Sequence, residues 1–373
     1  MLFKQLNKLM KPVSKGISQS TWQLTNIENR RAVPEVINGV KYRMATIHDF
    51  KGVMDINRNI YNGLDYLQST YKESFGNSKK YLGVATVEND IVAFTMHSVV
   101  DDWNSFIRQA SRVKMGFQGQ GLIPNLGYYI QKNIMENHPM LNQFYDTVDN
   151  WDEVKSRLST KKQEYKPKMK RSVVSFDANP FEFHQSIRNI IKAEKPIGYE
   201  LNKIQMPVMP EIASMLEECE KGRLFPTGFI LANWSPYRIQ YTSNYKLILE
   251  DTKTVFVTTD EKGRLLSISF GTHIDTPSAM RYTTDYYGTS EQDAIYHIMK
   301  HVILISQMDQ ERDISFSVLL PETLDKLTIK DFVVTKMGLT NQGTGENSVL
   351  ILKWPLLQPR EECWKPELQL DIL

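Results

Sequence analysis

The chain has 373 residues, which is long enough for two domains with a hydrophobic core in each. Its 45 basic and 43 acidic side chains leave a formal net charge of +2, so the overall charge favours neither nucleic acid nor a membrane surface as a partner. Two cysteines, Cys219 and Cys363, are too few for a disulfide framework or a zinc cluster. We therefore expect a cytoplasmic protein that binds a small molecule; its oligomeric state stays open.

Residues 1–38 are predicted to be a disordered tail. The first 26 residues carry four lysines, and no acidic residue precedes Glu28. Import signals share this bias, which makes a mitochondrial location the alternative, but the arginines typical of transit peptides are absent from this stretch. Composition therefore favours a solvated tail.

The first regular elements are predicted from residue 40 onward. Alternating and continuous apolar runs indicate strands, and apolar residues at helical spacing indicate helices. In chain order we expect a strand over 40–45, a helix over 47–60 and a second helix after 63–67. Three strands follow, over 81–87, 91–99 and 105–115. Glu88-Asn89-Asp90 lies between the strands expected over 81–87 and 91–99. This segment predicts a hairpin turn.

A glycine turn over 116–121 follows this meander and opens a helix over 122–135. Gln118-x-x-Gly121-x-Ile123 approximates the acetyl-CoA signature Arg/Gln-x-x-Gly-x-Gly/Ala, and Gly116-x-x-Gly119-x-Gly121 is the alternative frame. Glycines allow positive φ and close approach of a ligand, and the free N–H groups of a helix start bind anionic oxygens. The turn therefore predicts a pyrophosphate site.

Two other phosphate-binding loops fit this turn less well. A Walker A loop beginning at Gly116 requires Lys after Gly121, where Leu122 stands. A dinucleotide fingerprint beginning at Gly119 requires glycine at position 124, where Pro124 stands. Acetyl-CoA therefore remains the favoured ligand.

The elements after the turn complete an order that is typical of one fold. A strand over 143–148, a helix over 151–158 and a strand over 171–176 give β-α-α-β-β-β-turn-α-β-α-β. This order resembles the GNAT acetyltransferase fold, which places its CoA loop between the fourth strand and the third helix. We assign a catalytic GNAT domain to residues 39–185.

The second half repeats this order without the glycine pair. We expect strands over 254–259, 265–270 and 280–286, followed by a helix to about 307. A strand over 314–319, a helix over 329–337 and a strand over 349–354 complete this half. We interpret residues 186–373 as a degenerate GNAT-like domain that binds no CoA. The predicted fold class is thus α/β (α+β): a tandem GNAT fold with an N-terminal acetyl-CoA-binding domain.

Several segments from both halves resemble the vertebrate histidine N-acetyltransferases. They are Gly63-Leu64-Asp65-Tyr66-Leu67, Arg112-Val113, Gln118-Gly119-Gln120-Gly121, Trp234-Ser235-Pro236-Tyr237-Arg238 with Ser243-Asn244, and Asp285-Tyr286-Tyr287-Gly288-Thr289. The resemblance implies acetyl transfer from acetyl-CoA to the α-amine of free L-histidine. The family loop is rich in arginine where this chain has Gln118 and Gln120, and Ile123 replaces its usual small residue.

The GNAT pattern assigns roles to residues around the turn. It implies that a backbone N–H near Val113 to Met115 polarises the thioester carbonyl and that Asn150 binds the pantetheine arm. The pyrophosphate would lie on Gln118, Gly119, Gln120, Gly121, Leu122 and Ile123.

Catalytic and acceptor residues are less strongly indicated. Tyr165 is the candidate general acid and His97 a candidate base, although a packed tyrosine and a core histidine are the simpler interpretations. Asp65 and Tyr66 would lie at the acceptor, unless Asp65 only caps a helix. Arg238 would bind the substrate carboxylate, unless its segment only joins the domains.

Metal chemistry is not expected. His297 and His301 have the spacing of zinc ligands on a helix, but the His-Glu-x-x-His signature requires Glu where Ile298 stands. Two further hypotheses stay open: a GNAT enzyme acting on another small amine or on a peptide N-terminus, and a non-catalytic, CoA-binding scaffold.

Overall fold

The computed structural model describes residues 34–149, 166–178, 204–308, 312–341 and 348–354, together with the single residues 185, 188, 201, 203 and 356. The described residues belong to one compact unit by their contacts. No described helix is both long enough and apolar enough to cross a membrane. The predicted helix over 151–158 lies outside the described residues.

The first half contains seven named strands and five named helical segments among the residues described. The strands are β1 (Glu35–Ile37), β2 (Val40–Met44), β3 (Lys80–Val87), β4 (Asp90–Val100), β5 (Ser105–Val113), β6 (Gln143–Asp149) and β7 (Lys166–Ala178). Helices α2 (Phe50–Asp55) and α3 (Leu67–Gly76) precede β3, with the 3-10 turns η2 (Ile47–Asp49) and η3 (Ile60–Gly63) before each. Helix α4 (Leu122–Asn137) lies between β5 and β6.

The second half begins with elements that the sequence patterns did not predict. These are α8 (Met209–Glu218), α9 (Lys221–Leu224), the hairpin β8 (Phe229–Ala232) and β9 (Ser235–Arg238), and α10 (Ser243–Asp251). The elements that follow were expected, except the short strand β14 (Thr340–Asn341). They are β10 (Thr254–Thr259), β11 (Leu265–Asp275), β12 (Met280–Tyr287), α11 (Glu291–Ile305), β13 (Ile314–Pro321), α12 (Lys326–Asp331) with the π-helix η4 (Phe332–Lys336), and β15 (Ser348–Trp354).

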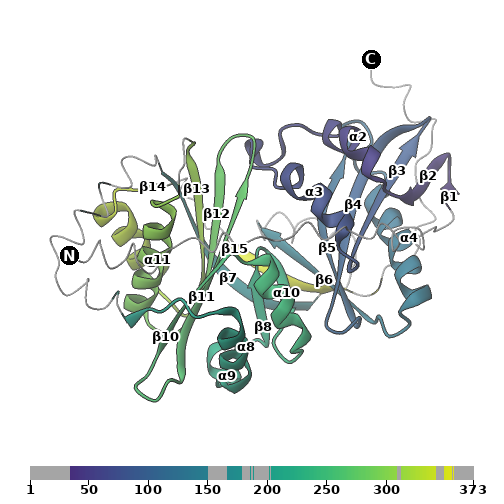
Figure 1. The fold of residues 1–373 in the computed structure, drawn as a ribbon. Helices are drawn as coiled ribbons and strands as arrows, with labels where there is room; N and C mark the ends of the chain where they lie inside the picture. The colour runs from purple at the N-terminus through teal and green to yellow at the C-terminus, as the bar shows by residue number, and fades with distance from the viewer. Residues whose placement is uncertain are drawn as a thin grey trace, which may run out of the picture. The chain divides into compact units, whose positions relative to one another are not determined.

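A single mixed sheet contains all the described strands except β8 and β9. Its order is β1-β2-β3-β4-β5-β6-β15-β7-β13-β12-β11-β10, with β14 also on β7. The two halves exchange strands in the middle of this order, because β15 of the second half lies between β6 and β7, and β7 of the first half lies between β15 and β13 (Figure 1).

Helices cover opposite faces of the first half's strands. A Cβ added at Gly83 of β3 would meet Ile130 and Leu126 of α4. The neighbouring Leu82 and Val84 instead pack in a cluster with Val53 of α2 and Leu67 of α3. Since adjacent strand residues point to opposite faces, α4 lies on one face, and α2 and α3 lie on the other.

Several boundaries differ from the sequence expectation; for example, β7 begins at Lys166 rather than at 171, and β11 ends at Asp275 rather than at 270. The helix expected over 47–60 ends at Asp55, and the Asn57 side chain accepts a hydrogen bond from the Asn59 N–H (2.9 Å) just beyond it. Asn side chains compete with helical hydrogen bonds in this way. At the N-terminus, β1 begins at Glu35, within the stretch that composition assigned to the tail.

Candidate active site

A gap between β5 and β6 is the central feature of the first half. These parallel strands pair only at Ser105↔Gln143, Phe106↔Phe144 and Ile107↔Tyr145. Beyond Ile107, β5 remains paired with β4 along its other edge, and β6 remains paired with β15 along its other edge. One edge of β5 therefore faces the gap, where its backbone groups can accept an extended ligand as a further strand.

A β-bulge in β5 lies beside this gap. Phe94 pairs with Arg112 and Met96 with Gln109, so Ala110 and Ser111 together lie opposite one residue of β4. Ala110 has a φ of 53°, a left-handed value that costs free energy for any residue with a Cβ. Bulges redirect side chains and end regular pairing, and they are frequent at functional sites.

The N–H of Val113, a predicted backbone contact of the ligand, is oriented towards the gap. The Lys114 N–H donates to the Val92 carbonyl on β4 (2.8 Å). Because successive N–H groups of a strand point to opposite edges, the Val113 N–H faces the gap. Met115, the other predicted backbone contact, lies just after the strand with a side chain that is 86% exposed.

The glycine turn presents an open helix start to solvent. Gly116, Gly119 and Gly121 all have positive φ, and Gly121 is the N-cap of α4, with no side-chain hydrogen bond to the cap among the described residues. Neither Gly116 nor Gly119 has a described atom within 4 Å of an added Cβ. Gln118 and Gly119 are exposed, the Gln120 side chain bonds the Gly116 carbonyl (3.0 Å), Leu122 is buried and Ile123 is half-buried. An anion fits this loop.

The corresponding part of the second half is closed. Strands β12 and β13 pair continuously from Met280↔Ile314 to Asp285↔Leu319. At the end of this pairing, Arg171 of β7 forms a buried ion pair with Asp285 and also donates to the Leu319 carbonyl (3.1 Å). Burial raises the pKa of Asp285 to about 6, although Arg171 opposes this shift.

The helix start in the second half also differs. The Ser290 side chain caps α11 by accepting from the Asp293 N–H (3.1 Å). Glu291 and Asp293 place two carboxylates in its first turn, where they repel a phosphate. Both differences favour the first half as the CoA-binding half.

On the face that carries α2 and α3, Asp65 forms a buried ion pair with Arg112. Arg112 Nη1 lies 3.0 Å from Asp65 Oδ2, and Arg112 Nη2 lies 3.2 Å from Oδ1. Asp65 also accepts from the Leu67 N–H (3.1 Å) at the start of α3. Asp65 therefore attaches the loop before α3 to the bulged strand, and its contact with a substrate stays a prediction.

Residues of the second half close around this loop. Ser278 donates from Oγ to the Asn62 carbonyl (3.1 Å) and from its backbone N–H to the Gly63 carbonyl (3.3 Å). The Arg281 guanidinium lies 5.9 Å from the ring centroid of Tyr61 and 5.3 Å from that of Trp234. Burial raises the pKa of the nearby Tyr66 phenol. A small acceptor beside Tyr66 would thus contact both halves.

A cavity of about 320 Å³ lies between the two halves. Its walls come from α3, the end of β4, the turn of the β8–β9 hairpin, α10 and β11. Ser98 lines it and donates to the Gln109 side chain (2.6 Å), one residue before the bulge. Charges of both signs, such as Glu73 and Lys253, line the same cavity. A zwitterionic small molecule is compatible with such walls.

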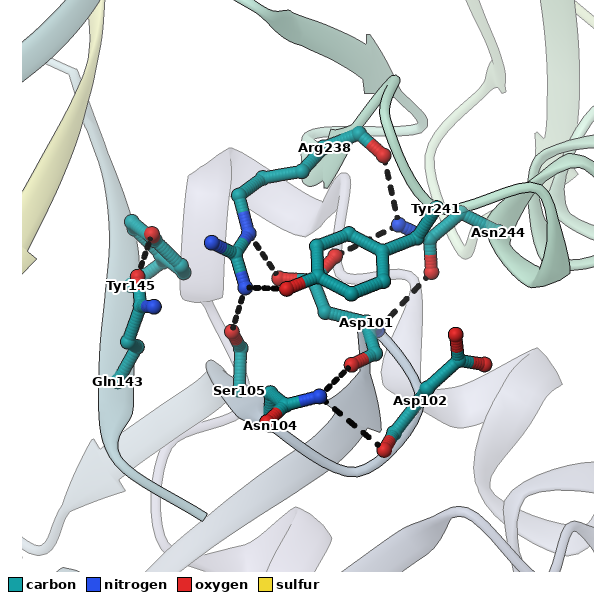
Figure 2. A network of polar contacts seen from close by, with 9 residues as sticks. All are labelled: Asp101, Asp102, Asn104, Ser105, Gln143, Tyr145, Arg238, Tyr241 and Asn244. Carbon is teal, nitrogen blue, oxygen red and sulfur yellow. Dashed lines mark hydrogen bonds and ion pairs between the residues drawn. The ribbon is translucent and has the colours of Figure 1, made fainter. Parts of the chain in front are cut away.

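Arg238 belongs to a polar network between the halves (Figure 2). Its Nε donates to Asp101 Oδ2 (2.7 Å), and its Nη2 donates to Ser105 Oγ (3.2 Å) and the Tyr241 hydroxyl (3.1 Å). Asn244 completes the network by donating to Asp101 Oδ1 (2.6 Å). These contacts join the two halves, and the predicted contact of Arg238 with a substrate carboxylate stays a prediction.

His97 lies in the core beneath the closed end of the gap. Its ring stacks on Phe106 (4.7 Å between centroids) and near Phe144 (6.4 Å). Burial, with a smaller contribution from Arg108, lowers the pKa of His97 to about 3. Such an imidazole is a weak proton acceptor at neutral pH, and its assignment as a base stays a prediction.

Two of the remaining predicted residues, Tyr165 and Asn150, lie outside the described residues. The rings of His297 and His301 form hydrogen bonds with hydroxyl groups. The Ser269 hydroxyl lies between the two rings, 2.7 Å from His297 Nδ1 and 2.8 Å from His301 Nε2. Among the residues that the structure describes, no group of three or more His, Cys, Asp or Glu side chains is arranged to hold a metal ion.

Sequence reasoning missed Arg281 and the turn of the β8–β9 hairpin. Asn233 and Trp234 have φ values of 48° and 64°, as in the tight turns that connect antiparallel strands. An asparagine between two short apolar runs was the available signal. Arg281 had no local signal, because its position depends on the pairing of β12 with β11 and β13.

Comparison with known proteins agrees with this description. In structure, the chain is similar to a GCN5-related N-acetyltransferase from Sphaerobacter thermophilus, with a TM-score of 0.50 at 9% identity over 87% of this chain and 98% of that one. The chain therefore has a GNAT fold of mixed α/β class, with two GNAT-like halves in tandem.

The sequence comparisons narrow this class. The family model "Histidine N-acetyltransferase, C-terminal" matches residues 207–320. A histidine N-acetyltransferase of Oreochromis niloticus is 20% identical over 232 residues, 60% of this chain and 66% of that protein. One from Scomber australasicus is 26% identical over 92 residues, 24% of this chain and 27% of that protein. The chain is thus similar to histidine N-acetyltransferases, and it spans less than two thirds of the length of each of these two relatives.

Proposed function

We propose that this protein transfers the acetyl group of acetyl-CoA to the α-amine of free L-histidine. The observation that carries the proposal is the gap between β5 and β6, which leads to an uncapped helix start in the first half only. The second half closes both features with Arg171 and with the capped start of α11.

The choice of a small acceptor is supported by the contacts across the acceptor side. Ser278 binds the loop before α3, and Arg281 lies over Tyr61 of that loop. An extended peptide would require an open groove at this point. The match of residues 207–320 to the histidine N-acetyltransferase C-terminal region favours histidine among the small amines.

The proposed reaction needs few protein groups. The neutral α-amine attacks the thioester carbon, a C–N bond forms, the C–S bond breaks, and the proton lost by the amine ends on the CoA thiolate. A backbone N–H on the edge of β5 that faces the gap can stabilise the negative oxygen of the intermediate, as backbone donors do in other acyl transfers. Tyr66, whose pKa is raised by burial, stays protonated near neutral pH and can donate to a substrate oxygen.

The test is to incubate the purified chain with acetyl-CoA and each of the twenty free amino acids. Released CoA and acetylated product are measured together, the product by mass. We expect turnover with histidine and little with the other amino acids. Turnover with another amino acid would keep the reaction and overturn the substrate.

The two remaining hypotheses predict different results in the same assay. Turnover of a short peptide, with none of any free amino acid, would indicate an N-terminal acetyltransferase. Acetyl-CoA binding without turnover of any amine would indicate a CoA-binding scaffold. Either result would overturn the proposal.

A further inference from the structure

His97 is a buried histidine whose ring receives no hydrogen bond from the described residues around it. Three histidines are fully buried within the described ranges: His97, His297 and His301. Both ring nitrogens of His297 and of His301 lie within 3.0 Å of a hydroxyl oxygen. Neither ring nitrogen of His97 has a hydrogen-bond partner among the described residues.

This arrangement costs stability without a visible structural return. A buried polar atom without a partner costs about 1–3 kcal/mol. The ring lies against Phe106 and Phe144, which a phenylalanine side chain at position 97 could also contact. A histidine at this position therefore requires a partner that the described residues do not provide.

The position of His97 relates it to the gap. Phe106 and Phe144, on which it stacks, are a directly paired couple, and the strands separate after the next pair, Ile107↔Tyr145. In β4, His97 pairs with Arg108, the first residue of β5 beyond that point. His97 and Arg108 share one face of the sheet, so the imidazole lies at the closed end of the gap.

The length of the gap indicates which part of an acyl-CoA would reach this end. From Val113, next to the glycine turn, back to Arg108 is five strand residues, or about 17 Å at 3.3 Å per residue. An extended pantetheine arm has a similar length. With its pyrophosphate at the turn, acyl-CoA would place its thioester at the closed end.

Burial, with a smaller contribution from the positive charge of Arg108, keeps the His97 imidazole neutral. Arg108, opposite His97, forms an ion pair with Asp146 of β6, and its guanidinium also lies 5.3 Å from the Phe144 ring centroid. A neutral imidazole offers one N–H donor and one acceptor nitrogen. It can therefore donate to a carbonyl oxygen or accept from an amide N–H without carrying charge.

We propose that His97 is a positioning residue for the acyl donor, which hydrogen-bonds the thioester end of acyl-CoA in the gap between β5 and β6. This inference rests on the proposed use of acetyl-CoA and adds a specific contact to it. The contact aligns the thioester with the acceptor side, and it gives the buried imidazole its missing partner.

Nitrogen-15 NMR of the imidazole rings tests this contact directly. The chain has seven histidines, and the spectrum of a His97→Gln variant identifies the signals of His97. Acetyl-CoA should shift these signals, because a new hydrogen bond changes the ring nitrogens. The fragment 3′-phospho-ADP, which contains the phosphates of CoA without the pantetheine arm, should leave them unchanged.

Binding to variants provides the second readout, measured by calorimetry without an acceptor. His97→Phe should weaken acetyl-CoA binding about tenfold while the affinity for 3′-phospho-ADP stays as in the wild type. His97→Gln, which retains a donor and an acceptor, should recover part of the loss. A general structural defect would instead weaken both ligands.

The outcomes separate the two proposals. If the wild-type chain binds no acetyl-CoA, the proposed function fails and this inference fails with it. If the wild type binds acetyl-CoA, but the His97 signals do not move and His97→Phe binds equally well, the inference alone is wrong.

Discussion

Arg112 and Asp65 form a bidentate ion pair that is almost wholly buried, with side chains 3% and 11% exposed. Arg112 follows the bulge of β5, and Asp65 precedes α3. The pair therefore joins the strand that borders the gap to the loop that covers the acceptor side. It also places a guanidinium 5.9 Å from the Phe94 ring centroid, within the core of that half.

Replacing Arg112 with methionine should destabilise the protein by about 3–5 kcal/mol, because it leaves the Asp65 carboxylate buried without its partner. Unfolding in urea, followed by circular dichroism, measures this change. Lys114→Met is the matched control: Lys114 lies beyond the same strand and forms an exposed ion pair with Asp90, worth at most about 1 kcal/mol. Equal losses in the two variants would contradict a buried role for Arg112.

The glycine turn can be tested with a pair of tryptophan substitutions. Gly119 and Gly263 have φ values of 79° and 77°, and no described atom lies within 4 Å of an added Cβ at either. Gly119→Trp and Gly263→Trp should therefore cost similar stability, about 1 kcal/mol from the positive φ. Only Gly119→Trp should abolish acetyl-CoA binding, as measured by calorimetry. Normal binding by this variant would show that the pyrophosphate lies elsewhere.

Local patterns predicted the elements that carry the CoA-binding features. The strand over 105–115, the glycine turn and the helix over 122–135 correspond to β5, the turn and α4, each within two residues of its predicted ends. Alternation, glycines and helical spacing are short-range signals, so the sequence contains them directly. The closed second half was also predictable in part, since its turn lacks the glycine pair.

Long-range relations had no such signal. The exchange of β7 and β15 depends on pairing between strands about 180 residues apart, and the Arg112–Asp65 pair joins residues 47 positions apart. The bulge at Ala110 breaks no sequence rule for a strand. A charged or apolar side chain fits many partners, and tertiary packing alone selects one.

The strand exchange predicts how truncation affects folding. A chain that ends before β15 would leave the edges of β6 and β7 unpaired in the middle of the sheet, and unpaired edges promote aggregation. We expect such a chain to be aggregated in size-exclusion chromatography. A chain that begins after β1 is the control, because β1 pairs with β2 alone at the outer edge and its loss should be tolerated. A monodisperse chain without β15 would contradict the exchange.

One acetyl-CoA should bind per chain. The start of α11 is capped by Ser290 and carries Glu291 and Asp293, which repel phosphate. Ser290→Ala should lower the unfolding free energy by about 1 kcal/mol through loss of the cap, without changing the stoichiometry found by calorimetry. Two molecules bound per wild-type chain would show that the second half also binds CoA.

His97 should make the stability of the protein depend on pH in a specific direction. Burial lowers the pKa of His97 to about 3 in the folded chain, whereas an unfolded histidine titrates near 6.5. Between these values the unfolded chain binds the additional proton, so this contribution to stability is present above pH 6.5 and is lost as the pH falls towards 3. The loss approaches about 1.4 kcal/mol per pH unit.

His97→Phe lacks the titrating group and should therefore be more stable than the wild type by a margin that grows from pH 7 to pH 4, as measured by urea unfolding at each pH. His48→Phe, at an exposed turn, is the control and should show no growing margin. A margin that stays constant for His97→Phe would mean that water or another partner reaches the imidazole in the folded chain.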